Sequence, residues 1–486
     1  MLTRELFEIA HGPVSDTAYA LIVEMHTTIE TLREQVADLK TLVKELKDRL
    51  DKDSHNSSKP PSSDGLQKKP VTLRRKIGRK PGGQQGHPGR TLTFAETPEH
   101  TIVHLPHACR GCGAELDQTP SVLNEKRQVF DIAPIQLECT EHQAYTKCCP
   151  ECGERTTALF PTGVQSSVQY GPRFGAAMLY CTQYQMLPTD RTREMAADLF
   201  GASVSEGTLY NIIKRASAAL SPVETDIKDA LAKQKVTHHD ETGARVSGSL
   251  HWFHVACTAM LTVYFPHKNR GKAAMDAMGV LANSTGRAVH DGWKPYFHYS
   301  CRHGLCNVHH LRELLAVFEQ EGQQWAQEMS GVLLDMKKEV ARASEEGRSN
   351  VPVLTQCKLE GRYKAALAAG YRANPPPERS GKRGRTRRTV GGNLVRRLDT
   401  YQAETLAFFY DFAVPFDNNL AERDIRMIKV RLNVSGCFRS EEGADQFARI
   451  RGYISTMRKQ GHNVLDTLLS VCRGNPTLPA LGATQP

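Results

Sequence analysis

Residues 234–266, QKVTHHDETGARVSGSLHWFHVACTAMLTVYFP, decide the fold of the central part of this 486-residue chain. They contain three runs rich in aromatic and β-branched residues, QKVTHHDE, SLHWFHVACT and MLTVYFP, which predict three strands. The stretch GKAAMDAMGVLA (271–282) then predicts a helix, and GRAVHDGW (286–293) predicts a fourth strand. We therefore expect an α+β core that begins near residue 233.

Two acidic residues lie at predicted strand ends in this block. Asp240 ends the first strand, in HHDETG, and Asp291 ends the fourth, in HDGW. The ends of neighbouring strands can bring two carboxylates to a shared hard cation, as phosphoryl transfer with two Mg²⁺ ions requires. Trp293, two residues later, either packs in the core or stacks on an unpaired base.

A third acid is expected on a later helix, within PFDNNLAERDIRMIKV (415–430). We choose Glu422, because Asp424 points elsewhere on the helix and Asp417 lies in the preceding loop. The helix face of Glu422 carries side chains that could contact phosphate: Asn418, Asn419, Arg426 and Lys429.

Four histidines near these acids allow two interpretations. His238 and His239 precede the first acid and could position water or phosphate, although such histidines more often satisfy local hydrogen bonds. His309 and His310 follow Cys306, and paired with cysteines they could indicate a second zinc site, although this pattern alone is weak.

Two Cys-x-x-Cys units, CRGCG (109–113) and CPECG (149–153), favour a structural zinc site. The glycine after each unit permits the tight turn that brings both thiolates to one ion. We expect the four ligands Cys109, Cys112, Cys149 and Cys152, with Cys148 as a substitute for Cys149. A redox role is less favoured, because no thioredoxin-like context surrounds the pairs.

The N-terminal region carries a seven-residue repeat that predicts a parallel two-stranded coiled coil and hence a homodimer. The alternative is one amphipathic helix packed on its own chain. The repeat places Ile22, Ile29, Val36, Val43 and Leu50 at one position, and Met25, Leu32, Leu39 and Leu46 three residues later.

Two basic stretches and one helix pair indicate DNA as a partner. Between Lys52 and Arg90 there are ten Lys or Arg and two Asp, including Arg74, Arg75 and Lys76, and between Arg379 and Arg397 there are eight Lys or Arg and no carboxylate. Residues 189–219 predict helix, turn and helix, an arrangement that suits major-groove recognition but also occurs in ordinary helical hairpins. The exposed face of its second helix is expected to carry Thr208, Asn211, Lys214 and Arg215.

The net charge of +10 agrees with a polyanionic partner. No apolar run has the ~20 residues that a transmembrane helix needs, and the first residues do not resemble a signal peptide. We therefore expect no membrane association, and a cytoplasmic protein whose thirteen cysteines are reduced.

Several stretches, in order along most of the chain, resemble the transposases of the insertion sequence 66 family. They are NSSKPPSSD, GGQQGHPG, the paired CxxCG units, HHDETG, HDGWKPY, CNVHHLRE, VPFDNNLAERDIRMIKV and SGCFRS. The resemblance implies a ribonuclease H-like core with a DDE triad at Asp240, Asp291 and Glu422, which binds Mg²⁺ or Mn²⁺. It implies an enzyme that cuts and joins DNA at the ends of a bacterial insertion sequence, aided by accessory transposition proteins.

The expected fold class is multidomain α+β. The parts are a coiled coil (18–52), a basic linker (53–95), a zinc-binding module (96–160), a helix-turn-helix-like region (165–222), the first part of a ribonuclease H-like core (233–318), a helical insertion with a basic loop (319–392), the second part of the core (393–436) and a C-terminal helical segment (437–486). Two alternatives stay open: a non-catalytic zinc and helix-turn-helix regulator, and a nuclease on the same fold.

Overall fold

The computed structural model describes residues 12–13, 15–50, 92–133, 135–376 and 388–482, and these form a mixed α+β structure. Residues 166–189 and 207–482 belong to one compact unit, and residues 92–165 and 190–206 belong to a second, smaller unit. The expected α+β class is therefore confirmed.

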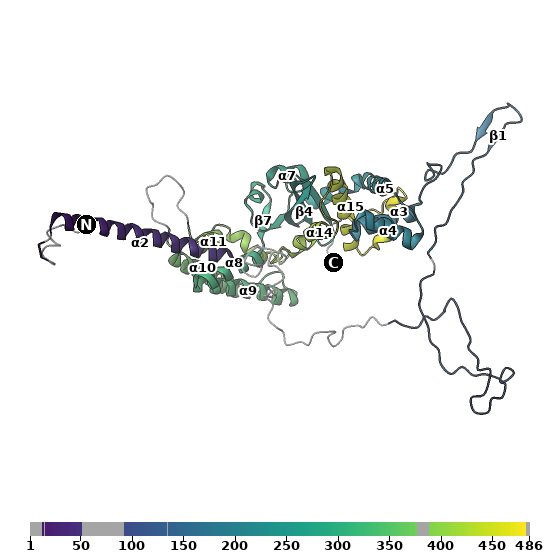
Figure 1. Ribbon diagram of the computed structural model, residues 1–486, viewed down its shortest axis with the longest axis horizontal. Helices are drawn as coiled ribbons and strands as arrows, with labels where there is room; N and C mark the ends of the chain where they lie inside the picture. The colour runs from purple at the N-terminus through teal and green to yellow at the C-terminus, as the bar shows by residue number, and fades with distance from the viewer. Residues whose placement is uncertain (1–11, 14, 51–91, 134, 377–387, 483–486) are drawn as a thin grey trace. The chain divides into compact units, whose positions relative to one another are not determined.

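A five-stranded mixed sheet lies at the centre of the larger unit, in the order β5-β4-β3-β6-β7 (Figure 1). The central strand, β3, pairs antiparallel with β4 and parallel with β6. The strands are β3 (Val236–Val246), β4 (Ser249–Cys257), β5 (Thr262–His267), β6 (Arg287–His290) and β7 (Arg302–Leu305).

The first strand extends further than its sequence indicates. Asp240 was expected at its end, but β3 continues to Val246, so this expectation was wrong. The strand continues because Ser247 and Gly248, both with positive φ (49° and 78°), form a two-residue hairpin turn into β4. Residues 241–245, ETGAR, are mostly polar or small, so the sequence pattern did not predict that the strand continues through them.

The fifth strand, β7, was not expected from the sequence. It has four residues, RHGL, and three of them are buried. A short strand that is buried on both faces shows no alternation of polar and apolar residues, so periodicity cannot reveal it.

Helices cover the sheet and continue beyond it. On one face, residues of α14 and α15 pack against β3, β4 and β5 around Phe253 and Tyr264. A smaller core with Tyr296 and Met275 joins α7 to the short helix η3. The bounds are α3 (Pro172–Leu179), η2 (Tyr180–Tyr184), α5 (Glu206–Ala219), α6 (Ser221–Ala232), α7 (Lys272–Met278), η3 (Lys294–His298), α14 (Asn419–Ser435), α15 (Glu441–Lys459) and α16 (Val464–Cys472).

A helical region with its own apolar core separates β7 from α14 in the sequence. Trp325, Tyr363 and Phe409 are among its buried side chains. Its helices are α8 (Asn307–Glu321), α9 (Gln324–Glu345), α10 (Val353–Ala373), α11 (Val390–Thr400), α12 (Gln402–Thr405) and α13 (Ala407–Tyr410).

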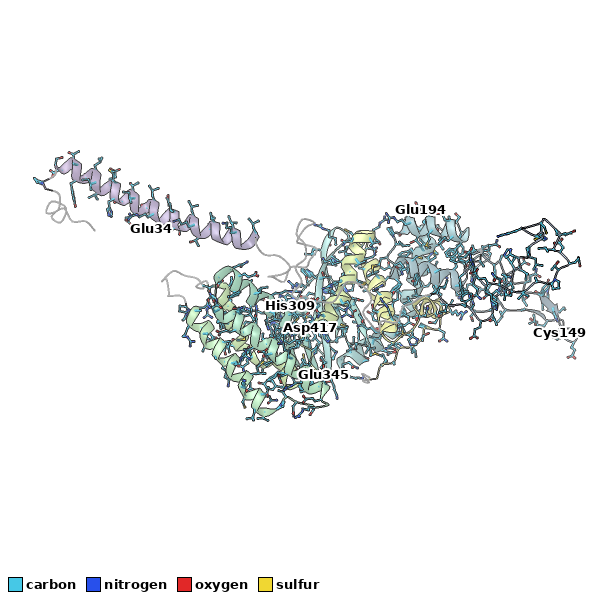
Figure 2. The ribbon with its side chains drawn as sticks, turned by 90° about the horizontal axis from the view of Figure 1, so that it is seen from below. Glu34, Cys149, Glu194, His309, Glu345 and Asp417 are labelled. Atoms are coloured by element: carbon cyan, nitrogen blue, oxygen red, sulfur yellow. The ribbon has the colours of Figure 1, made fainter. Side chains whose placement is uncertain are left out.

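The N-terminal heptads form one helix, α2 (Asp16–Leu50), on which Figure 2 labels Glu34. Its apolar side chains are exposed: Leu32 is 53% and Leu39 is 59% accessible. The apolar stripe that a coiled coil needs is therefore available in the chain on its own.

The smaller unit contains a short hairpin, β1 (Thr146–Cys148) and β2 (Arg155–Thr157), and most of α4 (Thr189–Phe200). Cys148 pairs with Arg155, so residues 149–154 form the hairpin turn that carries the second Cys-x-x-Cys unit. Among the helices of the described part, none is long and apolar enough to span a membrane.

Candidate active site

Asp240 on β3 and Asp291, directly after the neighbouring strand β6, lie at corresponding positions. The parallel pairing of β3 with β6 ends at His238 and Val289. Asp240 and Asp291 each lie two residues further along, and Asp291 directly follows the end of β6. The predicted position of Asp291 at a strand end is confirmed, and Asp240 lies just beyond the end of the parallel pairing.

Alternation along β3 places Asp240 on the face that packs against α14. On this face His238, two residues earlier, contacts Asn418, and Ala244 belongs to the core shared with α14. Glu422 lies in the first turn of α14. The third predicted acid therefore lies on the helix that covers the strand carrying the first.

Asn418, which is 1% exposed, connects the start of α14 to β3. Its Nδ2 donates to the backbone oxygen of His239 at 2.8 Å, and its Oδ1 lies 2.9 Å from Nδ1 of His238. Its backbone N–H donates to Sγ of Cys306 at 3.2 Å. Asn418 was expected to contact phosphate, but its side chain is buried and occupied, so that expectation was wrong.

Electrostatics link the three acids. Burial and the neighbouring Glu241 carboxylate raise the pKa of Asp240 well above its usual value, and the charges of Asp291 and Glu422 raise it further. A bound cation would stabilise the charged form of the buried Asp240 carboxylate beside these acids. The donor set consists of oxygens, which suits Mg²⁺ or Mn²⁺.

On the opposite face of β3, Glu241 forms a second buried acidic group that is fully paired. Its side chain is 1% exposed and accepts hydrogen bonds from Arg270 at 2.8 Å and from the Tyr296 hydroxyl at 2.6 Å. The Arg270 guanidinium lies 4.1 Å from the ring of Trp293 and 4.7 Å from that of Trp252. Trp293 therefore packs against Arg270 and the small core around Tyr296, which agrees with the packing interpretation.

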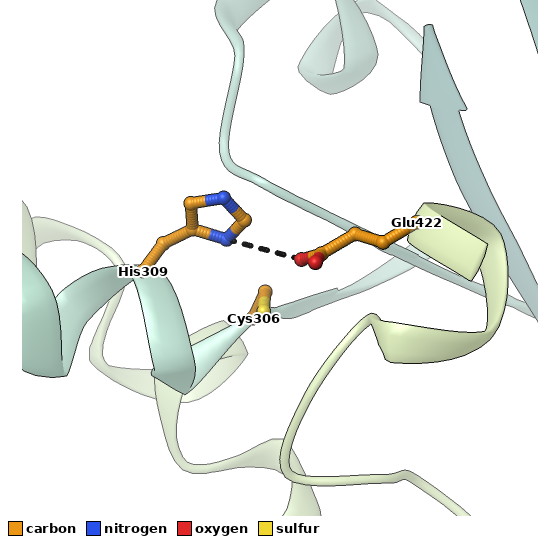
Figure 3. A group of neighbouring side chains, drawn as sticks. All are labelled: Cys306, His309 and Glu422. Carbon is orange, nitrogen blue, oxygen red and sulfur yellow. Dashed lines mark ion pairs between the residues drawn. The ribbon is translucent and has the colours of Figure 1, made fainter. Parts of the chain in front are cut away.

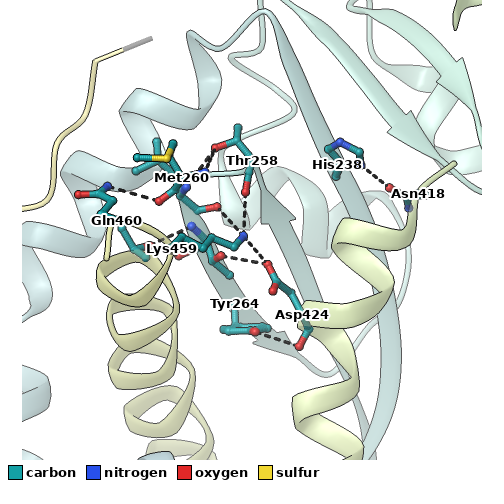
Figure 4. A network of polar contacts seen from close by, with 11 residues as sticks. His238, Thr258, Met260, Tyr264, Asn418, Asp424, Lys459 and Gln460 are labelled. Atoms are coloured by element: carbon teal, nitrogen blue, oxygen red, sulfur yellow. Dashed lines mark hydrogen bonds and ion pairs between the residues drawn. The ribbon is translucent and has the colours of Figure 1, made fainter. Parts of the chain in front are cut away.

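Asp424 and Asp417 have structural contacts. Asp424 accepts hydrogen bonds from Lys459 at 2.7 Å and from the Thr262 hydroxyl at 3.0 Å, on the side of α14 that faces α15 and β5 (Figure 4). Asp417 lies before α14 and accepts from the backbone N–H of Asn419. Both positions agree with the choice of Glu422.

The two cations of α14 that were expected to contact phosphate differ in their contacts. Arg426 is exposed, and its guanidinium lies 3.8 Å from Glu422. Lys429 donates to the backbone oxygen of Gly243 on β3 at 2.7 Å, and its ammonium keeps further donors for solvent or phosphate.

Three of the four histidines form hydrogen bonds within the fold, two of them with residues close in the sequence. His238 contacts Asn418, His239 contacts the Thr237 hydroxyl at 2.8 Å, and His310 contacts Asn307 at 3.2 Å. Burial lowers the pKa of His239 and of His310 to about 3, so both are neutral. His309 is different: its ring lies beside Glu422.

The two Cys-x-x-Cys units form turns of the same geometry. The backbone carbonyl oxygens of Cys109 and Cys149 each accept a hydrogen bond at 2.9 Å from the backbone N–H of the glycine that ends the unit, Gly113 or Gly153, whose φ is +76° or +74°. A backbone hydrogen bond from the second cysteine of each turn lowers the pKa of the first. Within the described residues the thiols of the two turns are not gathered into one metal-sized group, so the joint zinc site stays a prediction.

The predicted DNA-reading helix coincides with α5. Leu209, Ile212 and Ala216 are buried on it, whereas Asn211 and Arg215 are exposed. Thr208 is half-buried, and Lys214 lies 3.6 Å from Glu442 of α15. The linker residues that were predicted to contact DNA lie outside the described residues: Arg74, Arg75 and Lys76.

Comparison with known families adds an independent finding. The sequence profile described as "Transposase IS66 family" matches residues 167–446, which is more than half of the chain. The chain belongs to the IS66 transposase family. Transposases act on DNA, and the matched segment contains the sheet, α14 and all three predicted acids. A second profile, a family of unknown function (DUF6444), matches residues 13–93 of this transposase. The comparison of the whole chain with curated proteins found no match.

Proposed function

We propose that this chain is a DDE-type transposase that cuts the DNA ends of a bacterial insertion sequence and joins them to target DNA. One observation carries the proposal: Asp240, Asp291 and Glu422 come from two adjacent strand positions and the helix packed over them. The sheet order β5-β4-β3-β6-β7, in which three antiparallel strands (β5, β4 and β3) are followed by two strands parallel to β3, supports a ribonuclease H-like core.

The residues fit a divalent cation. Oε1 of Glu422 is buried and has no hydrogen-bond partner among the described residues, so it is free to coordinate. The charges of Asp291 and Glu422 disfavour ionisation of Asp240 in the absence of a cation. When bound, two Mg²⁺ ions would activate the attacking oxygen and stabilise the leaving oxygen.

The protein contributes position and charge to this chemistry. Asn418 holds the start of α14 against β3, and the paired Glu241 holds the other face of the same strand segment. Arg426 is exposed one turn from Glu422, where it can bind the phosphate next to the scissile bond.

The other parts of the chain supply DNA recognition and assembly in this proposal. The exposed Asn211 and Arg215 on α5 support base or phosphate contacts at the element ends. The exposed apolar stripe of α2 supports a parallel homodimer, which could hold two ends together. The paired cysteine turns support a structural Zn²⁺ site.

The deciding experiment is a cleavage and strand-transfer assay on end DNA with purified full-length variants. Asp240→Asn, Asp291→Asn and Glu422→Gln should each lose activity about a thousandfold or more, and double variants should be little worse than single ones. The variants should still fold and bind the ends.

Asp417→Asn and Asp424→Asn are the matched controls and should keep activity. The amide oxygen at position 424 can still accept hydrogen bonds from Thr262 and Lys459, whereas alanine would remove both hydrogen bonds together with the charge. Normal cleavage by both Asp240→Asn and Asp291→Asn would overturn the DDE assignment. A wild-type protein that binds the ends without cleaving them would favour the non-catalytic regulator. Cleavage without joining in the wild type would favour the nuclease.

A further inference from the structure

Cys306, His309 and Glu422 converge on one point between α8 and α14 (Figure 3). Cys306 immediately precedes α8, and His309, three residues later, lies on the same side of its first turn. Glu422 reaches them from the first turn of α14. One donor atom of each residue lies within 4.8 Å of the other two.

Two of these donor atoms lack hydrogen bonds. Nδ1 of His309 and Oε1 of Glu422 are both buried, lie 3.9 Å apart, and have no hydrogen-bond partner among the described residues. Buried polar atoms without a partner are uncommon because they cost free energy. A ligand that both atoms can share would remove this cost.

The chemistry of the three donors selects the ligand. A thiolate and an imidazole are ligands of Zn²⁺ and poor ligands of Mg²⁺. Zinc bonds of about 2.0–2.3 Å in a tetrahedron separate donor atoms by about 3.3–3.8 Å, so small side-chain movements suffice. The negative charges of one thiolate and one carboxylate balance the ion, and the thiol proton leaves to solvent on binding.

We propose that Cys306, His309 and Glu422 form an inhibitory zinc site, whose occupancy withholds Glu422 from the magnesium ions of the active site. The inhibitory part rests on the proposed function, because Glu422 is the third acid of that site. The site is distinct from the paired cysteine turns, which lie in the smaller unit. Three protein ligands leave one coordination position for water.

Zinc binding is the first test, because it does not depend on activity. The full-length chain is dialysed against Zn²⁺ without Mg²⁺, and bound zinc is measured by elemental analysis. Cys306→Ser and His309→Gln should each bind one ion fewer per chain than the wild type. Cys301→Ser is the matched control, since Cys301 is a nearby buried cysteine outside the group, and it should bind as much zinc as the wild type.

His309→Gln guards against misfolding, because its side chain is partly exposed whereas Cys306 is fully buried. Circular dichroism and thermal unfolding establish that each variant is folded. Wild-type zinc content in both folded variants would overturn the site.

Competition is the second test. Millimolar Mg²⁺ should release one zinc from the wild type and none from Cys306→Ser, because only the inhibitory site shares Glu422. Zinc should inhibit cleavage by the wild type, and each variant, compared with its own zinc-free activity, should need about tenfold more zinc or greater. Equal zinc sensitivity of all three proteins would overturn the inhibitory role.

The two proposals fail separately. Asp240→Asn tests the active site. It should still bind zinc at Cys306, His309 and Glu422, since Asp240 is not one of these ligands. Cleavage by Asp240→Asn and Asp291→Asn with zinc still lost in Cys306→Ser would overturn the transposase chemistry and keep the zinc site. The reverse result would overturn only the zinc site.

Discussion

At the residue scale, Asn418 joins two segments of the active site that are far apart in the sequence. Its side chain contacts His238 and the backbone of His239, directly before Asp240, while its backbone begins α14. The Asn418 amide therefore links the strand that carries Asp240 directly to the start of the helix that carries Glu422.

Asn418→Ala should disturb both stability and metal dependence. It leaves the His239 carbonyl and the His238 ring without partners, which should lower the free energy of unfolding by about 1–3 kcal/mol. Well below its melting temperature, the variant should need more Mg²⁺ for half-maximal cleavage. Asn419→Ala, at an exposed neighbouring position, is the control. An unchanged Mg²⁺ requirement in Asn418→Ala would mean that this residue only stabilises the fold.

How far the sequence predicts this site depends on the range of each interaction. Asp291 was placed correctly, because strand ends follow from local composition. Glu422 could be separated from Asp424 because helix periodicity assigns them different faces, and the Asp424–Lys459 pair agrees. The role of Asn418 could not be predicted, since its partner His238 lies 180 residues away. The alternation of side chains along a strand could have predicted that Glu241 lies on the opposite face of the sheet from Asp240.

At the element scale, α2 has a stripe of exposed apolar side chains at the positions of the seven-residue repeat. Leu32→Lys combined with Leu39→Lys would place charges in the seam of a coiled coil, where they lack partners. The double variant should sediment as a monomer and lose complexes that contain two DNA ends, while binding to single ends persists in weakened form.

The matched control for this variant is Thr27→Lys combined with Thr41→Lys. These positions lie outside the heptad seam and are exposed on the same helix, so the control adds the same charge without entering the seam. Dimerisation of the control and not of the Leu variant supports the coiled coil. A Leu variant that sediments like the wild type would show that α2 packs within its own chain.

Helix α5 and the basic linker should contribute differently to DNA binding. Thr208→Ala combined with Asn211→Ala should reduce the preference for element ends, because these side chains lie on the predicted reading face. Neutralising Arg74, Arg75 and Lys76 should weaken binding to all DNA and lower the salt slope by about 2–3. Lys214 is a poorer probe, since it also pairs with Glu442.

Binding isotherms on end DNA and on scrambled DNA, at several salt concentrations, separate these roles. An equal loss of end preference in both sets of variants would contradict the division between specific and general contacts.

At the scale of the whole molecule, the paired cysteine turns and the sheet belong to different compact units. The turns have the same backbone geometry and contain a cysteine with a lowered pKa, as thiolate ligands need. Metal binding at the turns should therefore stabilise the smaller unit without being required for the fold of the sheet.

Cys112→Ser and Cys152→Ser should each remove one Zn²⁺ per chain and weaken DNA binding. The thermal transition of the sheet-containing unit should persist in both variants, because its core contains neither turn. Cys139→Ser is the control, since Cys139 is exposed in the same unit and outside both turns. Elemental analysis together with calorimetry distinguishes the outcomes. Zinc retained in both variants would show that the turns do not form a zinc site, and zinc lost from Cys139→Ser would show that the ligands were wrongly assigned.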